Sequence, residues 1–223
     1  MTRVLGLLGM PGAGKTTAFE TLTSTDDFTG IQMKSIASEE FNQMQDKGLE
    51  MFSDETASEI QEQGLEDEAT PDGDIGDEIA DWVDTILSVN ESYFAEKAGL
   101  KISSMENSET VVVDGIRSVA DVEHISRASD HLQLVFLHTP FSTRLERLKD
   151  RGRSGEENID AQYLINRDEQ ELSWGVDDIL STYESEDYQK QYQVEFFYAN
   201  HNSVSQFKEE FVMFVDDLLN IES

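Results

Sequence analysis

Short apolar runs alternate along the chain with longer stretches in which apolar residues recur at helical spacing. Five such runs occupy residues 4–8, 31–36, 111–114, 132–137 and 194–198. Apolar runs bounded by glycine or polar residues are typical of strands buried on both faces of a parallel sheet. Together with the helical stretches between them, they predict a three-layer α/β/α fold around a parallel five-stranded sheet.

The stretches outside these runs predict helices over 16–22, 142–150 and 160–172, and a last helix near the C-terminus. Residues 38–107 differ, because they are polar and acidic, and their composition predicts a solvated loop at 64–74. One apolar helical face nevertheless occurs there, formed by Ile75, Ile79, Trp82, Val83 and Ile86.

We therefore expect a single domain over residues 1–223, with a core formed by 1–37 and 108–223. A mostly helical acidic insertion at 38–107 would separate the second strand from the third. Its charged face is either solvated surface or a site for a protein partner, and the pattern leaves both open.

The charge of the chain is strongly negative: 16 Lys and Arg face 47 Asp and Glu, giving a net charge of −31. Such a protein repels nucleic acid and anionic membranes, so neither is an expected partner. The acidic residues are spread through segments that also carry apolar residues at regular spacing, and they are not gathered in a tail. This distribution favours a halophilic protein over an acidic interaction protein. No apolar run reaches the roughly 20 residues of a membrane span, and residues 1–8 do not resemble a signal peptide, so we expect a cytoplasmic protein. Cysteine is absent, which excludes thiol catalysis and thiolate zinc sites.

The first apolar run is followed by a complete match to the phosphate-binding pattern G-x-x-x-x-G-K-[ST], at residues 9–16. In this pattern, glycines turn backbone N–H groups toward phosphate oxygens, and the following helix adds its partial positive charge. Lys15 would reach the β- and γ-phosphates, and the Thr16 hydroxyl would ligate Mg²⁺. The pattern predicts ATP and Mg²⁺ as cofactors. The predicted nucleotide contacts are Gly9, Pro11, Gly12, Ala13, Gly14, Lys15, Thr16, Thr17 and Arg147.

Arginines are concentrated after the third apolar run. Seven of the eight follow it, and six of these are candidates for the site: Arg117, Arg144, Arg147, Arg151, Arg153 and Arg167. Guanidinium groups hold phosphate oxygens and offset the charge of a transferring phosphoryl group. Pairing with acids on the same helix is an equal alternative for Arg144 and Arg147. Arg151 and Arg153 belong to a glycine-containing loop, so we predict a lid over about 149–160 that closes on the nucleotide.

Asp114 ends the third apolar run, where a carboxylate can hold Mg²⁺ through water or contact the Thr16 hydroxyl. Orienting an acceptor hydroxyl and capping the next turn are alternative roles. Arg117 would face the same cleft. The four histidines show no metal-binding spacing.

Four segments carry a family resemblance: residues 9–17, 112–118 (Val-Val-Asp-Gly-Ile-Arg-Ser), 144–153 and 167–175 (Arg-Asp-Glu-Gln-Glu-Leu-Ser-Trp-Gly). With them the chain resembles an archaeal P-loop kinase-like family related to adenylate kinase and dephospho-CoA kinase, and its acidity is similar to that of haloarchaeal proteins. The resemblance implies a nucleoside-monophosphate-kinase core with a helical acceptor-binding insertion and a lid. It also implies that Asn202 lies near the adenine ring.

The sequence departs from this family after the second strand. Ser38 stands where relatives carry an acid, and Phe41 stands where they carry an arginine for the acceptor. The donor side is therefore intact and the acceptor side is altered.

Two functions follow from these observations. The first is a kinase that transfers the γ-phosphoryl group of ATP to a nucleotide-like or dephospho-CoA-like acceptor, with Lys15, Asp114, Arg117, Arg151 and Arg153 as catalytic residues. The second is a regulatory or scaffolding ATPase that binds a protein partner through the insertion. A GTPase is disfavoured, because no guanine-recognition motif occurs.

Overall fold

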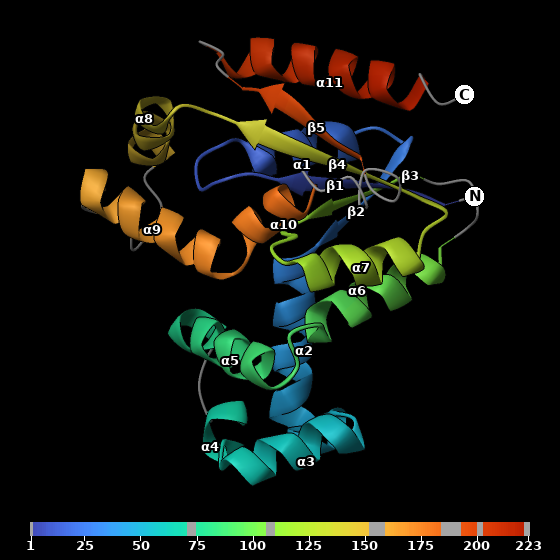
Figure 1. The fold of residues 1–223 in the computed structure, drawn as a ribbon, viewed down its shortest axis with the longest axis vertical. Coiled ribbons are helices and arrows are strands. Elements are labelled where there is room, and N and C mark those ends of the chain that lie inside the picture. The colour runs from blue at the N-terminus through green and yellow to red at the C-terminus, as the bar shows by residue number, and fades with distance from the viewer. Residues whose placement is uncertain are drawn as a thin grey trace.

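The computed structural model describes residues 2–70, 75–105, 110–151, 159–183, 193–199 and 203–220. Five parallel strands form one sheet in the order β2-β3-β1-β4-β5 (Figure 1). The strands are β1 (Arg3–Leu8), β2 (Phe28–Gln32), β3 (Thr110–Asp114), β4 (His131–His138) and β5 (Gln193–Tyr198). The predicted α/β class and parallel five-stranded sheet are confirmed. No helix in the described part of the chain has the length and apolarity needed to cross a membrane.

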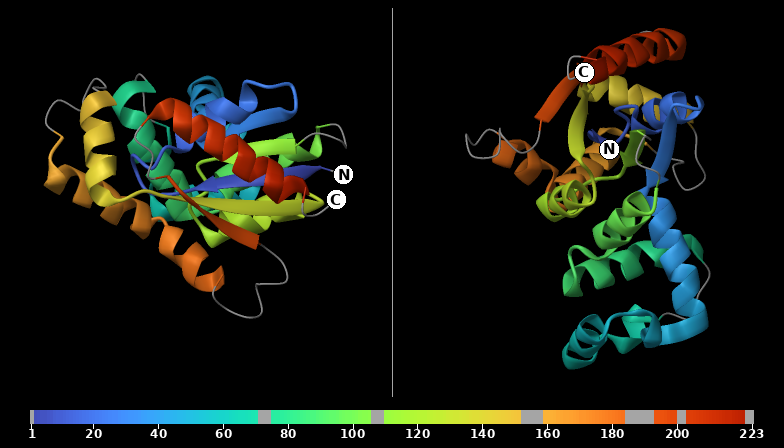
Figure 2. Two further views of the ribbon diagram at one scale, coloured as in Figure 1. Left: turned by 90° about the horizontal axis from the view of Figure 1, so that it is seen from above. Right: turned by 90° about the vertical axis from the view of Figure 1, so that its right-hand side faces the viewer.

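Helices cover both faces of the sheet, as the alternation of side chains along β1 requires. Leu5 and Leu7 point into the core beneath α1 (Lys15–Thr23) and α11 (Val204–Asn220). Val4 and Leu8 point to the opposite face, which α7 (Val119–Arg127) and α10 (Val176–Tyr183) cover (Figures 1 and 2). The result is the predicted three-layer arrangement.

The second strand differs from its predicted position. It spans Phe28–Gln32, whereas most of the predicted run 31–36 forms the start of helix α2 (Met33–Lys47). Buried Met33, Ile36 and Ala37 repeat at helical spacing, so the same apolar residues serve a helix face instead of a strand. Gly30 belongs to the strand because Phe19 packs over it, and a Cβ at this position would lie 2.4 Å from the Phe19 ring.

The described part of the chain between β2 and β3 consists of helices joined by short turns (Figure 1). It contains α2, the 3₁₀ turn η1 (Gly48–Met51), α3 (Asp54–Gln63), α4 (Glu66–Ala69), α5 (Ile75–Val89) and α6 (Tyr93–Ser103). Phe41, Trp82, Tyr93 and Phe94 form a chain of ring contacts at its centre, with centroids 5.2–5.8 Å apart. This cluster is continuous with the core beneath the sheet, so the helices and the sheet share one apolar interior.

Helices α8 (Phe141–Arg151) and α9 (Ala161–Ser173) project beyond the sheet on the side opposite the two termini (Figure 2). They match the predicted helices 142–150 and 160–172. Leu148, Ile159 and Leu164 form a small separate core between them. The predicted lid at 149–160 falls largely on residues 152–158, which lie outside the described residues, as do Arg153 and Asn202.

Candidate active site

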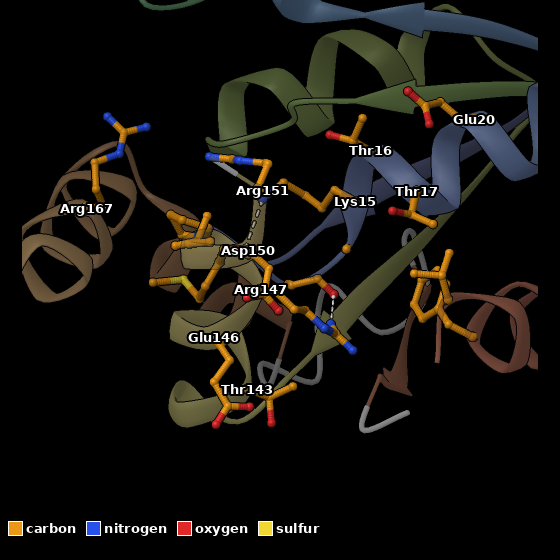
Figure 3. Close-up of a pocket in the computed structure, with 18 of the residues that line it drawn as sticks. Lys15, Thr16, Thr17, Glu20, Thr143, Glu146, Arg147, Asp150, Arg151 and Arg167 are labelled. Carbon is orange, nitrogen blue, oxygen red and sulfur yellow. Dashed lines mark hydrogen bonds between the residues drawn. The ribbon is translucent and has the colours of Figure 1, made fainter. Parts of the chain in front are cut away.

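A cavity of about 930 Å³ lies where β1 leads into α1 (Figure 3). It is lined by residues 10–17, by parts of α8 and α9, and by Ser203, Val204 and Phe207 at the start of α11. The Lys15 side chain extends from the start of α1 into the cavity, where the Arg151 side chain is drawn beside it in this view, and Arg167 of α9 lies farther away (Figure 3). The cavity thus joins the phosphate-binding pattern to the arginine-rich helices.

The backbone of residues 9–16, here called the glycine loop, depends on the absence of side chains. Gly9 and Gly12 have φ angles of 141° and 77°, in the region that favours glycine. A Cβ at Gly12 would lie 3.0 Å from the Arg144 carbonyl oxygen, so α8 packs directly on the loop. The loop ends where α1 begins at Lys15, which places the partial positive charge of the helix N-terminus at the cavity.

Lys15 is bound by the loop that carries it. Its Nζ donates hydrogen bonds to the carbonyl oxygens of Gly9 and of Met10, the latter at 3.4 Å. Burial lowers the pKa of Lys15, and the nearby carboxylates of Glu171 and Asp114 oppose that shift. The ammonium group is therefore a largely desolvated cation, bonded to carbonyl oxygens that phosphate oxygens can replace.

Asp114 lies at the carboxyl end of β3, which is hydrogen-bonded to β1, and its Cα pairs with that of Leu7. The residue is 9% exposed, and its Oδ1 is buried without a hydrogen-bond partner, while Oδ2 accepts from Gln32 Nε2 at 3.4 Å. Burial raises the pKa of Asp114, and Lys15 is the strongest charge that opposes the shift. A buried carboxylate oxygen without a partner is rare and indicates a ligand or ordered water.

Mg²⁺ fits these groups. No group of three or more His, Cys, Asp or Glu side chains suited to a metal occurs within the described residues. Mg²⁺ does not need such a cage, because it is usually held by one or two protein ligands, water and substrate phosphates. The Thr16 hydroxyl and the unpaired Asp114 oxygen supply ligands of this kind.

The contacts of Arg144 and Arg147 do not follow the alternative of pairing along their own helix, and contact of either with a nucleotide stays a prediction. Arg144 forms a bidentate pair with Asp168 of α9, both N–O distances being 2.7 Å, and donates to the Pro11 carbonyl oxygen at 3.0 Å. Arg147 donates to the carbonyl oxygens of Ala13 at 3.3 Å and Ala199 at 3.0 Å. Burial lowers the pKa of Arg147, which also lines the cavity. Both arginines tie α8 to the glycine loop instead of pairing along their own helix.

The other predicted arginines occupy different places. Arg151, at the end of α8, is exposed and lines the cavity. Arg167 also lines the cavity, and its Nη1 donates to Gln170 Oε1 at 2.7 Å. Arg117 is absent from the described lining of the cavity. Its Nε donates to Glu171 Oε2 at 3.4 Å, and its guanidinium lies 4.4 Å from the centroid of the Trp174 ring.

The sequence-based assignment of roles missed Asp168, Glu171 and Trp174. All three belong to the segment 167–175 that carries part of the family resemblance, so a signal was present. The structure also shows the contacts of Ser38 and Phe41, the two positions that depart from the family. Ser38 Oγ donates to the Lys34 carbonyl oxygen of its own helix, and Phe41 is fully buried against Trp82.

This fold and glycine loop define a P-loop protein of the kinase-like class. A family model described as an AAA domain matches residues 5–165, which is more than half of the chain, and the chain belongs to that family. It also belongs to the UPF0200 family. A UPF0200 protein of Methanothrix thermoacetophila is 31% identical over 181 residues, covering 80% of this chain and 84% of the relative. A second one, of Methanosarcina acetivorans, is 28% identical over 184 residues, covering 81% and 82%.

Solved structures of similar fold include two sugar-related kinases. A sugar kinase of a Janibacter species has a TM-score of 0.52 at 13% identity, covering 97% of this chain and 95% of its own. A gluconokinase of Sinorhizobium meliloti has a TM-score of 0.50 at 14% identity, covering 99% and 97%. At such low identity the likeness establishes the P-loop kinase-like fold alone.

Proposed function

We propose that this protein is a cytoplasmic, halophilic kinase that binds ATP with Mg²⁺ and transfers the γ-phosphoryl group to a nucleotide-like or dephospho-CoA-like acceptor. The observation that carries the proposal is the proximity of a partly buried ammonium group and an unpaired buried carboxylate oxygen beside a glycine loop. Lys15 supplies the first and Asp114 the second. The unpaired oxygen is costly to bury without a ligand, and a magnesium-bound triphosphate would satisfy it and bind the ammonium group.

Each part of the cavity has a role in this proposal. Backbone N–H groups of the glycine loop bind the phosphates, and Lys15 exchanges the carbonyl oxygens of Gly9 and Met10 for β- and γ-phosphate oxygens. Thr16 and Asp114 hold Mg²⁺, which when bound neutralises charge on the β- and γ-oxygens. The nucleoside occupies the end lined by Arg147 and Phe207, near which the family resemblance places Asn202.

Transfer moves one phosphoryl group. The acceptor oxygen forms a bond to the γ-phosphorus, the bond between the γ-phosphorus and the β,γ-bridging oxygen breaks, and ADP leaves with that oxygen. A hydroxyl acceptor also releases its proton to water, whereas an ionised phosphate acceptor has none to release. Lys15 and the lid arginines, Arg151 and Arg153, offset charge on the transferring group, and Arg117 positions the acceptor.

A regulatory or scaffolding ATPase is the second candidate, and the structure of α2 favours it in one respect. The position of the expected acceptor arginine is taken by Phe41, whose ring is buried against Trp82, and Ser38 bonds to its own helix. The buried Phe41 ring has no charge with which to hold an acceptor phosphate, and the Ser38 hydroxyl is occupied as a donor. In this case the nucleotide site is retained and the acidic insertion binds a protein partner.

Two measurements test the proposal and separate the candidates. Calorimetric titration with ATP and Mg²⁺, at low and at molar KCl, should show binding that Lys15→Ala weakens strongly; no uptake of nucleotide would overturn both candidates. ATP consumption is then measured with nucleoside monophosphates, nucleosides and dephospho-CoA. Transfer to any of them supports the kinase, while slow hydrolysis that no acceptor stimulates supports the regulatory ATPase.

A further inference from the structure

Two segments that are far apart in the sequence interlock beside the cavity. The first follows β3 and carries Arg117, and the second is the end of α9 with the turn that follows it. Arg117 bonds to Glu171 across 54 positions of sequence and lies over the ring of Trp174. The backbones also meet, because a Cβ at Gly175 would lie 3.4 Å from the Arg117 carbonyl oxygen.

Arg117 is held at three points. Its backbone N–H donates to Asp121 Oδ2 at 2.9 Å, its Nε donates to Glu171 Oε2, and its guanidinium plane is supported by the Trp174 ring. Within the described residues, the two terminal nitrogens of Arg117 have no hydrogen-bond partner. The side chain is 39% exposed, so these nitrogens are open to a ligand. A fork of two free donors on an oriented guanidinium is the geometry that binds a phosphate in bidentate fashion.

Glu171 links this arginine to the donor side of the cavity. It is 5% exposed and lines the cavity itself. Among the charges that act on Lys15, that of Glu171 is the largest, ahead of Asp114. One buried carboxylate therefore lies close to both the cation assigned to ATP and the cation assigned to the acceptor.

We propose that Glu171 and Trp174 are positioning residues that preset Arg117 as the receptor for a phosphate group on the acceptor. That the bound phosphate belongs to an acceptor rests on the proposed kinase function. That Arg117 is oriented to bind a phosphate rests only on its contacts with Glu171 and Trp174. Presetting matters because an arginine side chain that is free in solution loses rotamer freedom when it binds, and an oriented one does not. The acceptor is then an anionic molecule whose phosphate is recognised from α9 and the β3–α7 connection, not from α2.

The test uses inorganic phosphate as the probe. The protein is first saturated with a non-hydrolysable ATP analogue and Mg²⁺, which fills the glycine loop, and phosphate is then titrated by calorimetry. Arg117→Ala should weaken phosphate binding at least tenfold, and Trp174→Ala about tenfold through loss of the stacked ring. Trp174→Phe keeps a ring and should stay within about threefold of the wild type.

Two variants of Glu171 distinguish a role in orienting Arg117 from a purely electrostatic effect of the carboxylate charge. Glu171→Gln keeps an oxygen that accepts from Arg117 Nε and should retain phosphate affinity within about threefold, whereas Glu171→Leu should lose about tenfold. Tighter phosphate binding by both variants would mean that Glu171 only repels anions, and would overturn the proposal. Glu169→Leu, at an exposed position of the same helix, is the matched control and should bind phosphate as the wild type does.

Further outcomes separate this inference from the proposed function. ATP titration of every variant reports whether the fold and the donor site survive, and Trp174→Ala serves if Glu171→Leu does not fold. If ATP fails to bind the wild type, the kinase proposal fails, and phosphate titration of Lys15→Ala without nucleotide still tests Arg117. Unchanged phosphate affinity in Arg117→Ala or Trp174→Ala overturns the receptor. Acetate binding as tight as phosphate would also overturn it, by indicating a carboxylate acceptor.

Discussion

Two buried carboxylates show how differently the cleft and the insertion are built. In the insertion, Glu40 accepts from the Tyr93 hydroxyl at 2.7 Å and pairs with Lys97 Nζ at 2.9 Å. Beside the cleft, at the end of β3, Asp114 is similarly buried but leaves Oδ1 without a partner. The insertion satisfies its polar groups and packs aromatic rings around them, which favours stability. The cleft retains unsatisfied groups, and such a cost is typical of a site awaiting a ligand.

The largest loss of stability is expected from a substitution in the aromatic cluster of the insertion. Phe41→Ala should lower the free energy of unfolding by about 4 kcal/mol, because it removes a fully buried ring that contacts Trp82. Denaturant unfolding measures the loss. ATP affinity should stay within about threefold while the protein remains folded, since no donor group is touched. A large loss of ATP affinity in the folded variant would show that α2 belongs to the donor site.

A smaller loss of stability is expected from breaking the ion pair that joins α8 to α9 beside the cleft. Asp168→Ala should cost about 3 kcal/mol, because it leaves the Arg144 guanidinium buried with only the Pro11 carbonyl oxygen as partner. The exposed pair of Arg127 and Glu123 is the control, and Glu123→Ala should cost about 0.4 kcal/mol. Equal costs would mean that Arg144 does not hold α8, α9 and the glycine loop together.

Lys15→Ala should separate ligand binding from stability. We expect ATP affinity to fall about 100-fold, from the loss of charge-assisted hydrogen bonds to phosphate. The unfolding temperature should not decrease, because burial lowers the pKa of Lys15 and its charge is costly in the empty protein. Lys101→Ala removes an exposed lysine paired with Glu39 and should leave ATP affinity unchanged. A Lys15→Ala protein that binds ATP normally would remove the basis of the donor site.

The smallest changes in stability are expected from substituting the two buried carboxylates, Asp114 and Glu40. Burial raises the pKa of Asp114 above its unfolded value, so ionised Asp114 costs stability at neutral pH and the cost disappears as the pH falls below both values. Asp114→Asn should therefore raise the unfolding temperature at pH 7, by an amount that shrinks in acid, while magnesium-dependent ATP binding weakens. Glu40→Gln should do the opposite and cost about 1–2 kcal/mol, since it weakens the pair with Lys97. The same sign for both would contradict the comparison.

The parts of the fold that were predictable are those coded by contiguous residues. The first, third, fourth and fifth strands and the helices α8 and α9 lie within a residue or two of their predicted positions. The second strand was misplaced because Ile31, Met33 and Ile36 suit a strand and a helix alike, and only the pairing of Phe28–Gln32 with β3 shows which of them belong to the strand. The burial of Phe41 was equally hidden, because an apolar residue in an acidic segment does not reveal its partners.

By itself, the sequence determined the glycine loop and what the loop can bind. Spacing alone brings Gly9, Gly12 and Lys15 together, since a turn between a strand and a helix depends on local backbone freedom. Tertiary structure decided which distant groups control the arginines: Asp168 holds Arg144 across 24 positions, and Glu171 holds Arg117 across 54. Such pairings arise only when α9 folds back beside α8 and the β3–α7 connection, because the geometry of an ion pair depends on two backbones whose separation no local pattern specifies.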